Sequence, residues 1–545
     1  MKHAALAVLA LTLAVGSPSA DACTNFLISR GASADGSTMI TYSADSHQLY
    51  GELYLTPGGS HLPTAERDVH EWDTGKYLGK IPQATVTYTV VGNINEWQVS
   101  IGETTYGGRK ELEEPNGIID YGSLMYIALE RARTAREAIR IMGELVAEHG
   151  YASSGESFSV ADPYEVWHME LIGKGKDEKG AVWVARRVPE GYVSAHANQA
   201  RIRTFPLKDK KNCLYSEDVI SFARKQGWFD GADADFSFAD AYAPLDFGAL
   251  RFCELRVFAF FNRIAPSLKL PTDYIDAKPG AEPLPLFVKP DRKLSLQDTM
   301  ELMRDHFEGT KWDLGKGVGA GPYELPYRWR PMVWEARGKK YVHERSTSTQ
   351  QTGFSFVAQA RSWLPNPLGG VLWFGVDDTA TTVYVPMYCG IREAPSPFAV
   401  GTGDFDSFSW DSAFWVFNFV TNYTYSRWKD MFQEVQKVQR ELEGGFVGRQ
   451  QGVDAAALEL YRRSPELARD YLTETSARAA GAAVERYRKL GEFLIWKYLD
   501  GNVRDEHGKI TQPGYPAHWL ERIADEGGEH LEKKRLPGEP EEESH

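Results

Sequence analysis

Apolar and polar residues alternate near the start of the chain in a pattern typical of β-strands. Residues 23–29 form the first such run and residues 37–45 the second. The segment between them has the composition of a turn and ends in an Asp-Gly pair. Together these segments predict a β-hairpin. If its turn is centred near Ala34, Asp45 lies within a residue or two of the position opposite Cys23.

The rest of the chain divides into regions with the period of strands and regions with the period of helices. Strands are predicted at residues 84–106, 156–161, 166–172, 181–188, 192–197, 354–361 and 370–388. Helices are predicted at residues 124–148, 247–264, 295–307, 412–444 and 454–496. No internal repeat is evident. The pattern predicts an α+β fold in which two antiparallel sheets are flanked by helices, in αββα layers.

Residues 1–22 have the features of a secretory signal peptide. Lys2 supplies the positive start, an apolar segment follows, and Ala20-Asp21-Ala22 forms a cleavage site of the A-x-A type. The apolar segment is shorter than the roughly 20 residues that cross a membrane as a helix. No later stretch approaches 18 uncharged apolar residues, so no transmembrane segment is expected. We therefore expect an exported protein, periplasmic or extracellular, cleaved after Ala22.

Composition excludes several classes of function. With a formal net charge of −14, the chain has no excess of basic residues to favour nucleic acid. His47, His149 and His196 do not share the spacing of metal ligands, and no cofactor is expected. The four cysteines include no CxxC pair. Apart from Cys23 they can form at most one disulfide, and a buried core position is the favoured interpretation of each. These three are Cys213, Cys253 and Cys389.

Cleavage after Ala22 would make Cys23 the first residue, with a thiol and an α-amine on one residue. An unperturbed thiol has a pKa of about 8.5 and an α-amine a pKa of about 8, so the amine can accept the thiol proton near neutral pH. Such a residue needs no histidine partner. The alternative is a lipoprotein anchored at Cys23. Ala20 and Asp21 argue against it. Lipoprotein leaders usually carry leucine at the position of Ala20, and they rarely carry an acidic residue at the position of Asp21.

The order of short motifs resembles the dipeptidase A (PepD-type) family of cysteine dipeptidases, within the N-terminal-nucleophile (Ntn) hydrolase superfamily. The resemblance extends from Cys23 to about residue 500, and no single motif carries it. The motifs are Cys23-Thr24-Asn25, Ala32-Ser33, Asp35-Gly36-Ser37-Thr38-Met39, Asn95-Glu96, Ser154-Gly155-Glu156, Ala161-Asp162-Pro163, Arg187-Val188-Pro189, Ala197-Asn198-Gln199, Tyr327-Arg328-Trp329-Arg330-Pro331 and Ser412-Ala413-Phe414-Trp415.

The resemblance implies a role for each matching residue. Cys23 would be the nucleophile, with its α-amine as the base, and Asp45 would orient that amine. Asn198 would lie near the nucleophile and contribute to the oxyanion hole, where one donor is typically worth about 3 kcal/mol. An arginine from the segment that contains Arg251 and Arg256 would complete the site, and Arg251 is favoured. Further substrate or oxyanion candidates are Tyr42, Thr104, Thr105 and Glu156.

One position departs from the related acylases, which have an arginine three residues before the aspartate. This chain has Tyr42 there, so shared electrostatics around the thiol cannot be assumed. The resemblance implies an exported dipeptidase that works through a thioester intermediate and takes dipeptides or small peptides. The alternatives are an N-acyl amide hydrolase similar to penicillin V acylase or bile-salt hydrolase, and a non-catalytic lipoprotein. Side-chain preference and oligomeric state are not predicted.

The expected organisation is a signal peptide over residues 1–22 and a single Ntn-hydrolase domain over residues 23–525. Within that domain, residues 445–525 are predicted to be mostly helical. Residues 526–545, rich in glutamate, are predicted to be an acidic disordered tail.

Overall fold

A six-stranded antiparallel sheet contains the first strands of the chain. The computed structural model describes residues 23–538, so the predicted signal peptide lies outside the described residues. The strand order is β14-β1-β2-β18-β19-β20, and every residue of these strands is buried. The strands are β1 (Asn25–Ile28), β2 (Thr38–Asp45), β14 (Val193–His196), β18 (Thr352–Ala360), β19 (Val371–Val376) and β20 (Val385–Tyr388). The predicted strand run 370–388 is therefore two strands joined by a loop.

The hairpin of β1 and β2 has the register that the turn spacing predicts. The pairing of the two strands continues into a bridge between Thr24 and Ser43. This register puts Asp45 one residue beyond the position opposite Cys23. The turn and the alternation of side chains set the strand pairing, so the position of Asp45 relative to Cys23 could be predicted from the sequence.

An eight-stranded antiparallel sheet forms the second layer, in the order β15-β13-β12-β11-β10-β9-β8-β3. The predicted run 84–106 is divided among four short strands, of which the last three belong to this sheet. The strands are β3 (Leu55–Thr56), β8 (Val90–Val91), β9 (Ile94–Asn95), β10 (Ser100–Gly107), β11 (Gly155–Ala161), β12 (Val166–Gly173), β13 (Ala181–Arg187) and β15 (Cys213–Tyr215).

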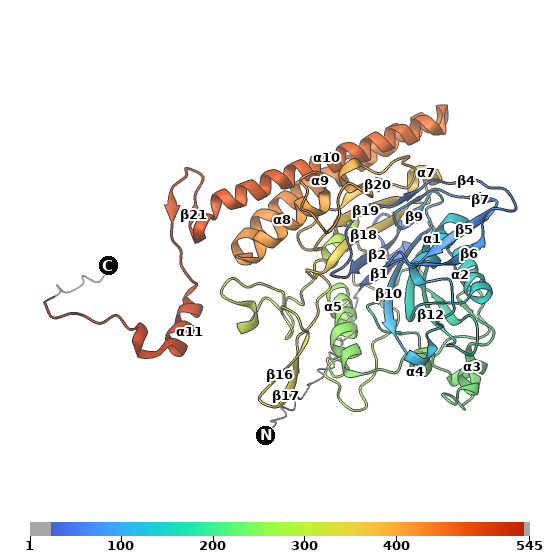
Figure 1. Ribbon diagram of the computed structural model, residues 1–545, viewed down its shortest axis with the longest axis horizontal. Helices are drawn as coiled ribbons and strands as arrows, with labels where there is room; N and C mark the ends of the chain where they lie inside the picture. Colours follow the sequence, from blue (N-terminus) through green and yellow to red (C-terminus); the bar gives the residue numbers. More distant parts are fainter. Residues whose placement is uncertain (1–22, 539–545) are drawn as a thin grey trace, which may run out of the picture.

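The two sheets pack against each other, and helices cover them. β2 contacts β10 and β11, while β1 contacts β12. The helices α1 (Tyr121–Arg131) and α2 (Ala135–His149) pack on the eight-stranded sheet. Three C-terminal helices, α8 (Ala413–Tyr425), α9 (Trp428–Arg463) and α10 (Pro465–Lys497), pack on β19 and β20 of the other sheet (Figure 1). The protein is therefore a mixed α+β fold built on antiparallel sheets, as the sequence predicted.

The helix predicted at residues 124–148 is two helices. α1 ends at Arg131 and α2 begins after Thr134, whose side chain accepts a hydrogen bond from the backbone of Glu137 at 3.2 Å. The buried Asn95 holds the break open, because its Nδ2 donates to the carbonyls of Leu129 and Ala132 at 2.7 Å each. An apolar period alone does not reveal such a break, since both helices present apolar faces to the same core.

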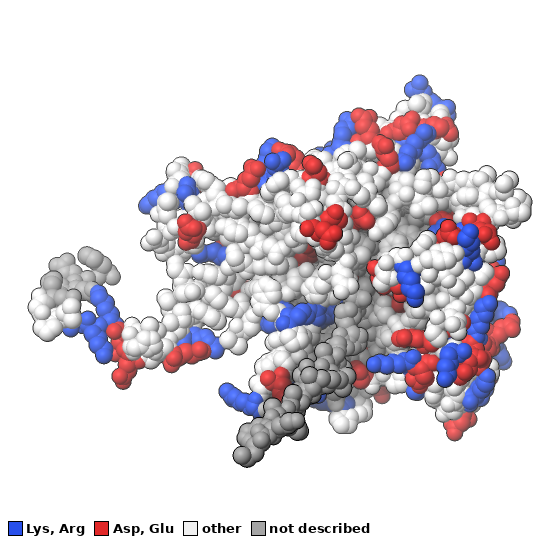
Figure 2. All heavy atoms as spheres, viewed as in Figure 1, with Lys and Arg blue, Asp and Glu red and all other residues white. Residues whose placement is uncertain are grey.

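The C-terminal helical region consists of three long helices. α8 (Ala413–Tyr425) and α9 (Trp428–Arg463) replace the helix predicted at 412–444, and α10 (Pro465–Lys497) follows a break at Ser464. Pro465 starts α10 because proline suits the first turn of a helix. Basic and acidic side chains are interspersed along α10 at the upper edge of the molecule in Figure 2, where pairs such as Arg478 with Glu474 are exposed.

The described residues after α10 form an arm that extends from the main body (Figure 1). It contains α11 (Ala517–Gly527) and a single helical turn at Gly528–Leu531. Of the predicted acidic tail, residues 526–538 are described and 539–545 are not. Between residues 23 and 538, no helix is both long enough and apolar enough to cross a bilayer.

The remaining elements connect these layers or form small ribbons. They are β4 (Gly59–Ser60), β5 (Glu66–His70), β6 (Tyr77–Pro82), β7 (Val86–Thr87), α3 (Val219–Lys225), α4 (Phe238–Tyr242), α5 (Leu255–Ile264), α6 (Leu296–Leu302), β16 (Val333–Ala336), β17 (Lys339–Val342), α7 (Asn366–Gly369), β21 (Val503–Arg504) and β22 (Ile510–Thr511). A π-helical turn, Ala249–Glu254, leads into α5, so the helix predicted at 247–264 changes its winding midway. α6 is shorter than the helix predicted at 295–307.

Candidate active site

A cavity of about 250 Å³ opens beside Cys23. Its lining comes from the end of the β1–β2 hairpin, from β10 and β11, from the start of α1, and from four loop segments. The lining residues are Cys23, Tyr42, Ala44, Asp45, Ser46, Leu49, Glu71, Trp72, Asp73, Glu103, Thr105, Glu113, Tyr121, Ala152, Ser153, Ser154 and Glu156. The fold therefore brings together residues that are up to about 130 positions apart in the chain.

Cys23 is held by polar contacts at both its nitrogen and its sulfur. Its backbone nitrogen donates a hydrogen bond to Oδ1 of Asn198 at 3.0 Å. Its Sγ lies 3.5 Å from Oε1 of Glu103 and 3.9 Å from the hydroxyl of Tyr42. The side chain is 5% exposed. Cys23 thus sits at the wall of the cavity with its nitrogen fixed and its sulfur beside a carboxyl group.

Asn198 makes its contacts from a strained backbone position. Its φ is +66°, a left-handed conformation that asparagine tolerates better than most residues. Its Nδ2 donates to the carbonyl of Thr105 at 2.6 Å, so the amide plane is fixed while Oδ1 faces the nitrogen of Cys23. Strain of this kind persists where the surrounding structure holds it, often at functional sites.

Arg256, on α5, is the arginine that the structure brings to Cys23. Its guanidinium donates to the carbonyls of Cys23 and Ala197, to Oγ1 of Thr24, and to Oδ1 of Asn198, all between 2.7 and 3.0 Å. The side chain is fully buried. Its Nε donates to the carbonyl of Phe252, within the π-helical turn.

Arg251, the arginine that the sequence analysis favoured, lies elsewhere. It pairs with Glu344 at 2.5 Å and does not line the cavity. The reason is the direction in which α5 faces. Phe260, one helical turn after Arg256, stacks on Phe26 of β1 with ring centroids 4.0 Å apart, so this face of the helix lies toward the hairpin. In the structure, therefore, Arg256 contacts Cys23, whereas the favoured Arg251 does not.

Asp45 is buried and accepts hydrogen bonds from both sides. The hydroxyl of Thr352 donates to its Oδ1 at 2.7 Å and that of Ser43 to its Oδ2 at 3.2 Å. Burial raises the pKa of Asp45 to about 7, although the charges of Arg345 and Arg256 and these hydrogen bonds act in the opposite direction. Asp45 therefore changes its charge near neutral pH close to Cys23.

The surroundings of Cys23 favour the neutral thiol. Burial raises the pKa of the Cys23 thiol well above its ordinary value, and the negative charges of Glu103 and Asp45 raise it further. A hydrogen bond from the backbone of Asp45 acts in the opposite direction. Since only the thiolate is a strong nucleophile, attack by Cys23 requires a group that takes the proton as the reaction begins.

Two carboxyl groups lie next to the thiol at the inner end of the cavity. Glu103 accepts a hydrogen bond from Tyr42 at 2.5 Å, and Glu156 accepts one from Thr105 at 2.7 Å. Burial raises the pKa of Glu103 to about 7. Burial and the neighbouring charge of Glu103 raise the pKa of Glu156 well above its ordinary range. At neutral pH the pair therefore shares protons instead of carrying two full charges.

The remaining predicted candidates divide between the cavity and the core. Tyr42, Thr105 and Glu156 line the cavity. Thr104 does not, because it lies between Glu103 and Thr105 on a strand whose side chains alternate in direction. Its hydroxyl instead makes a hydrogen bond of 2.7 Å with Nδ1 of His196.

Sequence reasoning missed two parts of this site. Glu103 precedes the two candidate threonines Thr104 and Thr105, and its contact with Cys23 depends on how β1 and β10 pack. Arg345, whose charge acts on Asp45, lies in the loop between Val342 and Thr352, which has no recognisable motif. The apolar period of residues 255–264 could have indicated Arg256, since Phe260 is one turn away on the same face.

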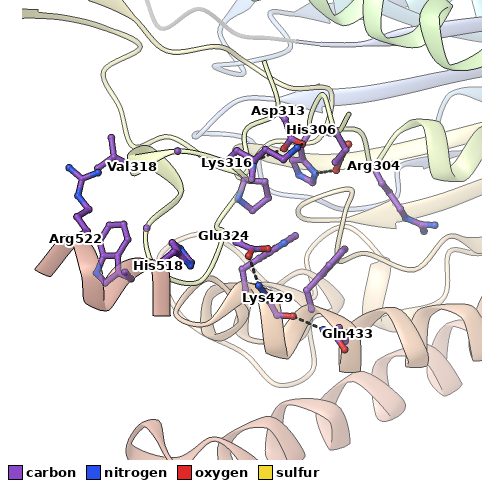
Figure 3. A pocket seen from close by; sticks show the side chains of 18 of the residues that line it. Arg304, His306, Asp313, Lys316, Val318, Glu324, Lys429, Gln433, His518 and Arg522 are labelled. Atoms are coloured by element: carbon purple, nitrogen blue, oxygen red, sulfur yellow. Dashed lines mark hydrogen bonds and ion pairs between the residues drawn. The ribbon is translucent and has the colours of Figure 1, made fainter. Parts of the chain in front are cut away.

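A larger cavity, of about 910 Å³, lies between the loop that follows α6, the helix α9 and the arm (Figure 3). Lys429 bonds to Glu324 there, and His306, Arg304 and Trp519 are among the lining residues. None of the predicted site residues lines it. The smaller cavity, and not the larger one, contains Cys23 and most of the residues that the sequence singled out.

The buried cysteine, the carboxyl groups with raised pKa and the α+β fold define a cysteine-type peptidase. The chain belongs to peptidase family C69, whose family model matches residues 60–441. That range contains Glu103, Glu156, Asn198 and Arg256, and it begins after the hairpin that carries Cys23.

Named relatives agree with this family. A probable dipeptidase of Salmonella dublin is 27% identical over 397 residues, which cover 68% of this chain and 82% of the relative. A probable dipeptidase of Latilactobacillus sakei is 25% identical, with 69% of this chain and 76% of the relative covered. Probable dipeptidase B of Streptococcus pyogenes serotype M1 is 22% identical, with 91% and 97% covered.

Proposed function

We propose that the protein is an exported dipeptidase in which Cys23, released as the first residue by removal of the leader, is the nucleophile. The observation that carries this proposal is the placement of Cys23, whose nitrogen is held by Asn198 while its sulfur faces the same cavity. In the mature form that nitrogen would be an α-amine. The names of the relatives support dipeptides as substrates.

In the proposed reaction the α-amine of Cys23 takes the proton from the thiol as Sγ attacks the carbonyl carbon of the peptide bond. A thioester forms, and the leaving amine takes the proton back from the α-ammonium. Water then attacks the thioester with the α-amine again as base, which releases the acid product and restores the thiol. General base catalysis of this kind typically contributes a factor of about 10² to 10⁴.

The neighbouring residues would hold this unit in place. Oδ1 of Asn198 accepts from the Cys23 nitrogen, and Arg256 fixes the carbonyls of Cys23 and Ala197 on either side. We assign Asp45 the role of orienting the α-amine, and the amide of Asn198 a contribution to the oxyanion hole. The packing of two antiparallel sheets between helices supports the αββα architecture of N-terminal-nucleophile hydrolases as part of the same proposal.

Substitution of the nucleophile tests the proposal. Cys23→Ala is expected to lower the rate of dipeptide hydrolysis by at least about a thousandfold with the fold intact. Cys213→Ala is a matched control, since Cys213 is also a free buried cysteine and lies on β15, away from the cavity. Full activity in Cys23→Ala would exclude the mechanism.

The role of the α-amine has its own test. A version of the mature chain with one additional residue before Cys23 would carry an amide nitrogen at that position, which cannot accept a proton. We expect this version to fold and to be inactive. Normal turnover would refute the amine as base.

The N-terminus itself distinguishes the proposal from a lipoprotein. Intact mass and N-terminal sequencing of the purified protein are expected to show Cys23 as the first, unmodified residue. A diacylglyceryl group on Cys23 or a retained leader would contradict it.

A further inference from the structure

The cavity beside Cys23 is rich in carboxyl groups. Six of its lining residues carry carboxyl groups, and none of the described residues that line it is a lysine or an arginine. The six are Asp45, Glu71, Asp73, Glu103, Glu113 and Glu156. A cleft lined by one sign of charge concentrates ligands of the opposite sign. This lining favours a cationic group on the substrate.

The two innermost carboxyl groups, Glu103 and Glu156, hydrogen-bond to each other. Burial and the neighbouring Glu103 raise the pKa of Glu156 well above its ordinary range, so the pair holds a shared proton. Apart from that proton, Oε2 of Glu103 and Oε2 of Glu156 have no donor among residues 23–538, and the two side chains are 1% and 0% exposed. An ammonium group that enters the cavity can take the place of the shared proton and supply donors to both oxygens.

We propose that Glu103 and Glu156 bind the α-ammonium group of the substrate and thereby direct Cys23 to the first peptide bond. This inference rests on the proposed function of Cys23. It further specifies which group of the substrate the protein recognises and which peptide bond is cleaved. An ammonium group has three N–H donors, enough to serve both free oxygens at once.

Distances within a peptide favour cleavage of the first peptide bond. A charged hydrogen bond would place the ammonium nitrogen about 2.8 Å from the carboxyl oxygens. The first carbonyl carbon lies about 2.5 Å beyond that nitrogen. Sγ of Cys23 is 3.5 Å from Oε1 of the same Glu103, so the thiol lies close to the position of the ammonium group and the first carbonyl is the one nearest to it along the substrate.

The same contact would assist the chemistry. The negative charge of Glu103 is the largest single charge effect that raises the pKa of the Cys23 thiol. A bound ammonium compensates that charge, which lowers the cost of forming the thiolate. A substrate without the ammonium would leave the two carboxyl groups with only their shared proton, and sites built for a hydrogen bond reject such analogues strongly.

The test compares two substrates that differ only in the ammonium group. These are L-alanyl-L-alanine and propionyl-L-alanine, which has the same amide without the amine. For the wild-type protein we expect kcat/KM to be at least a hundredfold higher for the dipeptide. In Glu156→Gln we expect at least a tenfold loss for the dipeptide, chiefly in KM, and no loss for propionyl-L-alanine. The glutamine can still donate to Glu103, so the fold should persist.

Glu111→Gln is the matched control. It removes one carboxylate from an exposed side chain that does not line the cavity. Its discrimination between the two substrates should equal that of the wild type. If Glu156→Gln keeps the wild-type discrimination, or if the wild type cleaves both substrates equally, the ammonium site is refuted while the cysteine mechanism stands. Absence of any Cys23-dependent hydrolysis would instead refute the proposed function.

A second measurement needs no variant of the acidic pair. Alanine chloromethyl ketone and its N-acetyl derivative alkylate cysteine, and only the first carries an ammonium group. Alkylation of Cys23 in the wild-type protein is expected to be at least tenfold faster with the free amine, and high salt should reduce the difference. Equal rates would overturn the ammonium site even if Glu156→Gln fails to fold.

Discussion

Replacing Arg256 by methionine tests the centre of the site most directly. Arg256 is the only residue among those described that hydrogen-bonds to Cys23, Thr24, Ala197 and Asn198 at once. Methionine occupies a similar volume along the stem but donates nothing. The substitution therefore removes five hydrogen bonds, including the one to Phe252, without opening a large cavity.

The expected cost follows from burial. Hydrogen bonds from a charged donor contribute about 1.5 to 3 kcal/mol each, and buried acceptors left unpaired cost about 1 to 3 kcal/mol. These contributions do not add, and breaking a buried charged contact by removing one partner typically costs about 3 to 5 kcal/mol in total. We expect a loss of this size in the free energy of unfolding of Arg256→Met.

Arg251→Met is the matched control, five residues earlier. The pair of Arg251 with Glu344 is partly exposed, with side-chain exposures of 17% and 22%. Such a pair contributes about 1 kcal/mol or less. Urea unfolding measures both losses, and dipeptide hydrolysis should fall at least a hundredfold in Arg256→Met and less than threefold in Arg251→Met. Equal stability and activity of the two variants would refute the assignment of Arg256.

Two further predictions concern stability. Because burial raises the pKa of Asp45 to about 7, the folded protein binds this proton more tightly than the unfolded chain, where the pKa is about 4. The free energy of unfolding should therefore fall as pH rises from about 4 to 7, by up to about 1.4 kcal/mol per pH unit from this group. Urea unfolding of Asp45→Asn should show a shallower slope, and an unchanged slope would contradict the burial argument. Gly155→Ala would place a Cβ 2.1 Å from the ring of Tyr106 and should cost about 1 to 3 kcal/mol. Gly481→Ala meets open space in α10 and should stabilise the protein by about 0.5 to 1 kcal/mol, so the opposite order in thermal unfolding would refute the packing.

The hairpin that presents Cys23 could be predicted because its determinants are local. Alternation and an Asp-Gly turn set the register, and the register alone places Asp45 next to Cys23. The α+β class followed in the same way from the order of strand-like and helical segments. Asn198 came from a resemblance of motifs, and its contact with the Cys23 nitrogen agrees with that placement.

Other features depend on contacts between distant segments, which no local pattern contains. The choice between Arg251 and Arg256 depends on which face of α5 lies against β1. The break after α1 depends on Asn95, which is about 35 residues away from the carbonyls it binds. Glu103 and Glu156 meet because β10 and β11 are neighbours, with Thr105 paired to Glu156. A strand pairing had to be known before the two carboxyl groups could be placed together.

The acidic surroundings of Cys23 also distinguish between the two amide substrates that the sequence left open. In the related acylases the position of Tyr42 is an arginine, whereas here the tyrosine donates to Glu103 and leaves the thiol beside carboxyl groups. An N-acyl amide has no ammonium group, so it would leave Glu103 and Glu156 with only their shared proton. A dipeptide brings an ammonium group to that place. The same carboxyl groups that disfavour the thiolate in the empty site would then favour a substrate that can neutralise them, which makes the dipeptide the better fit to this cavity.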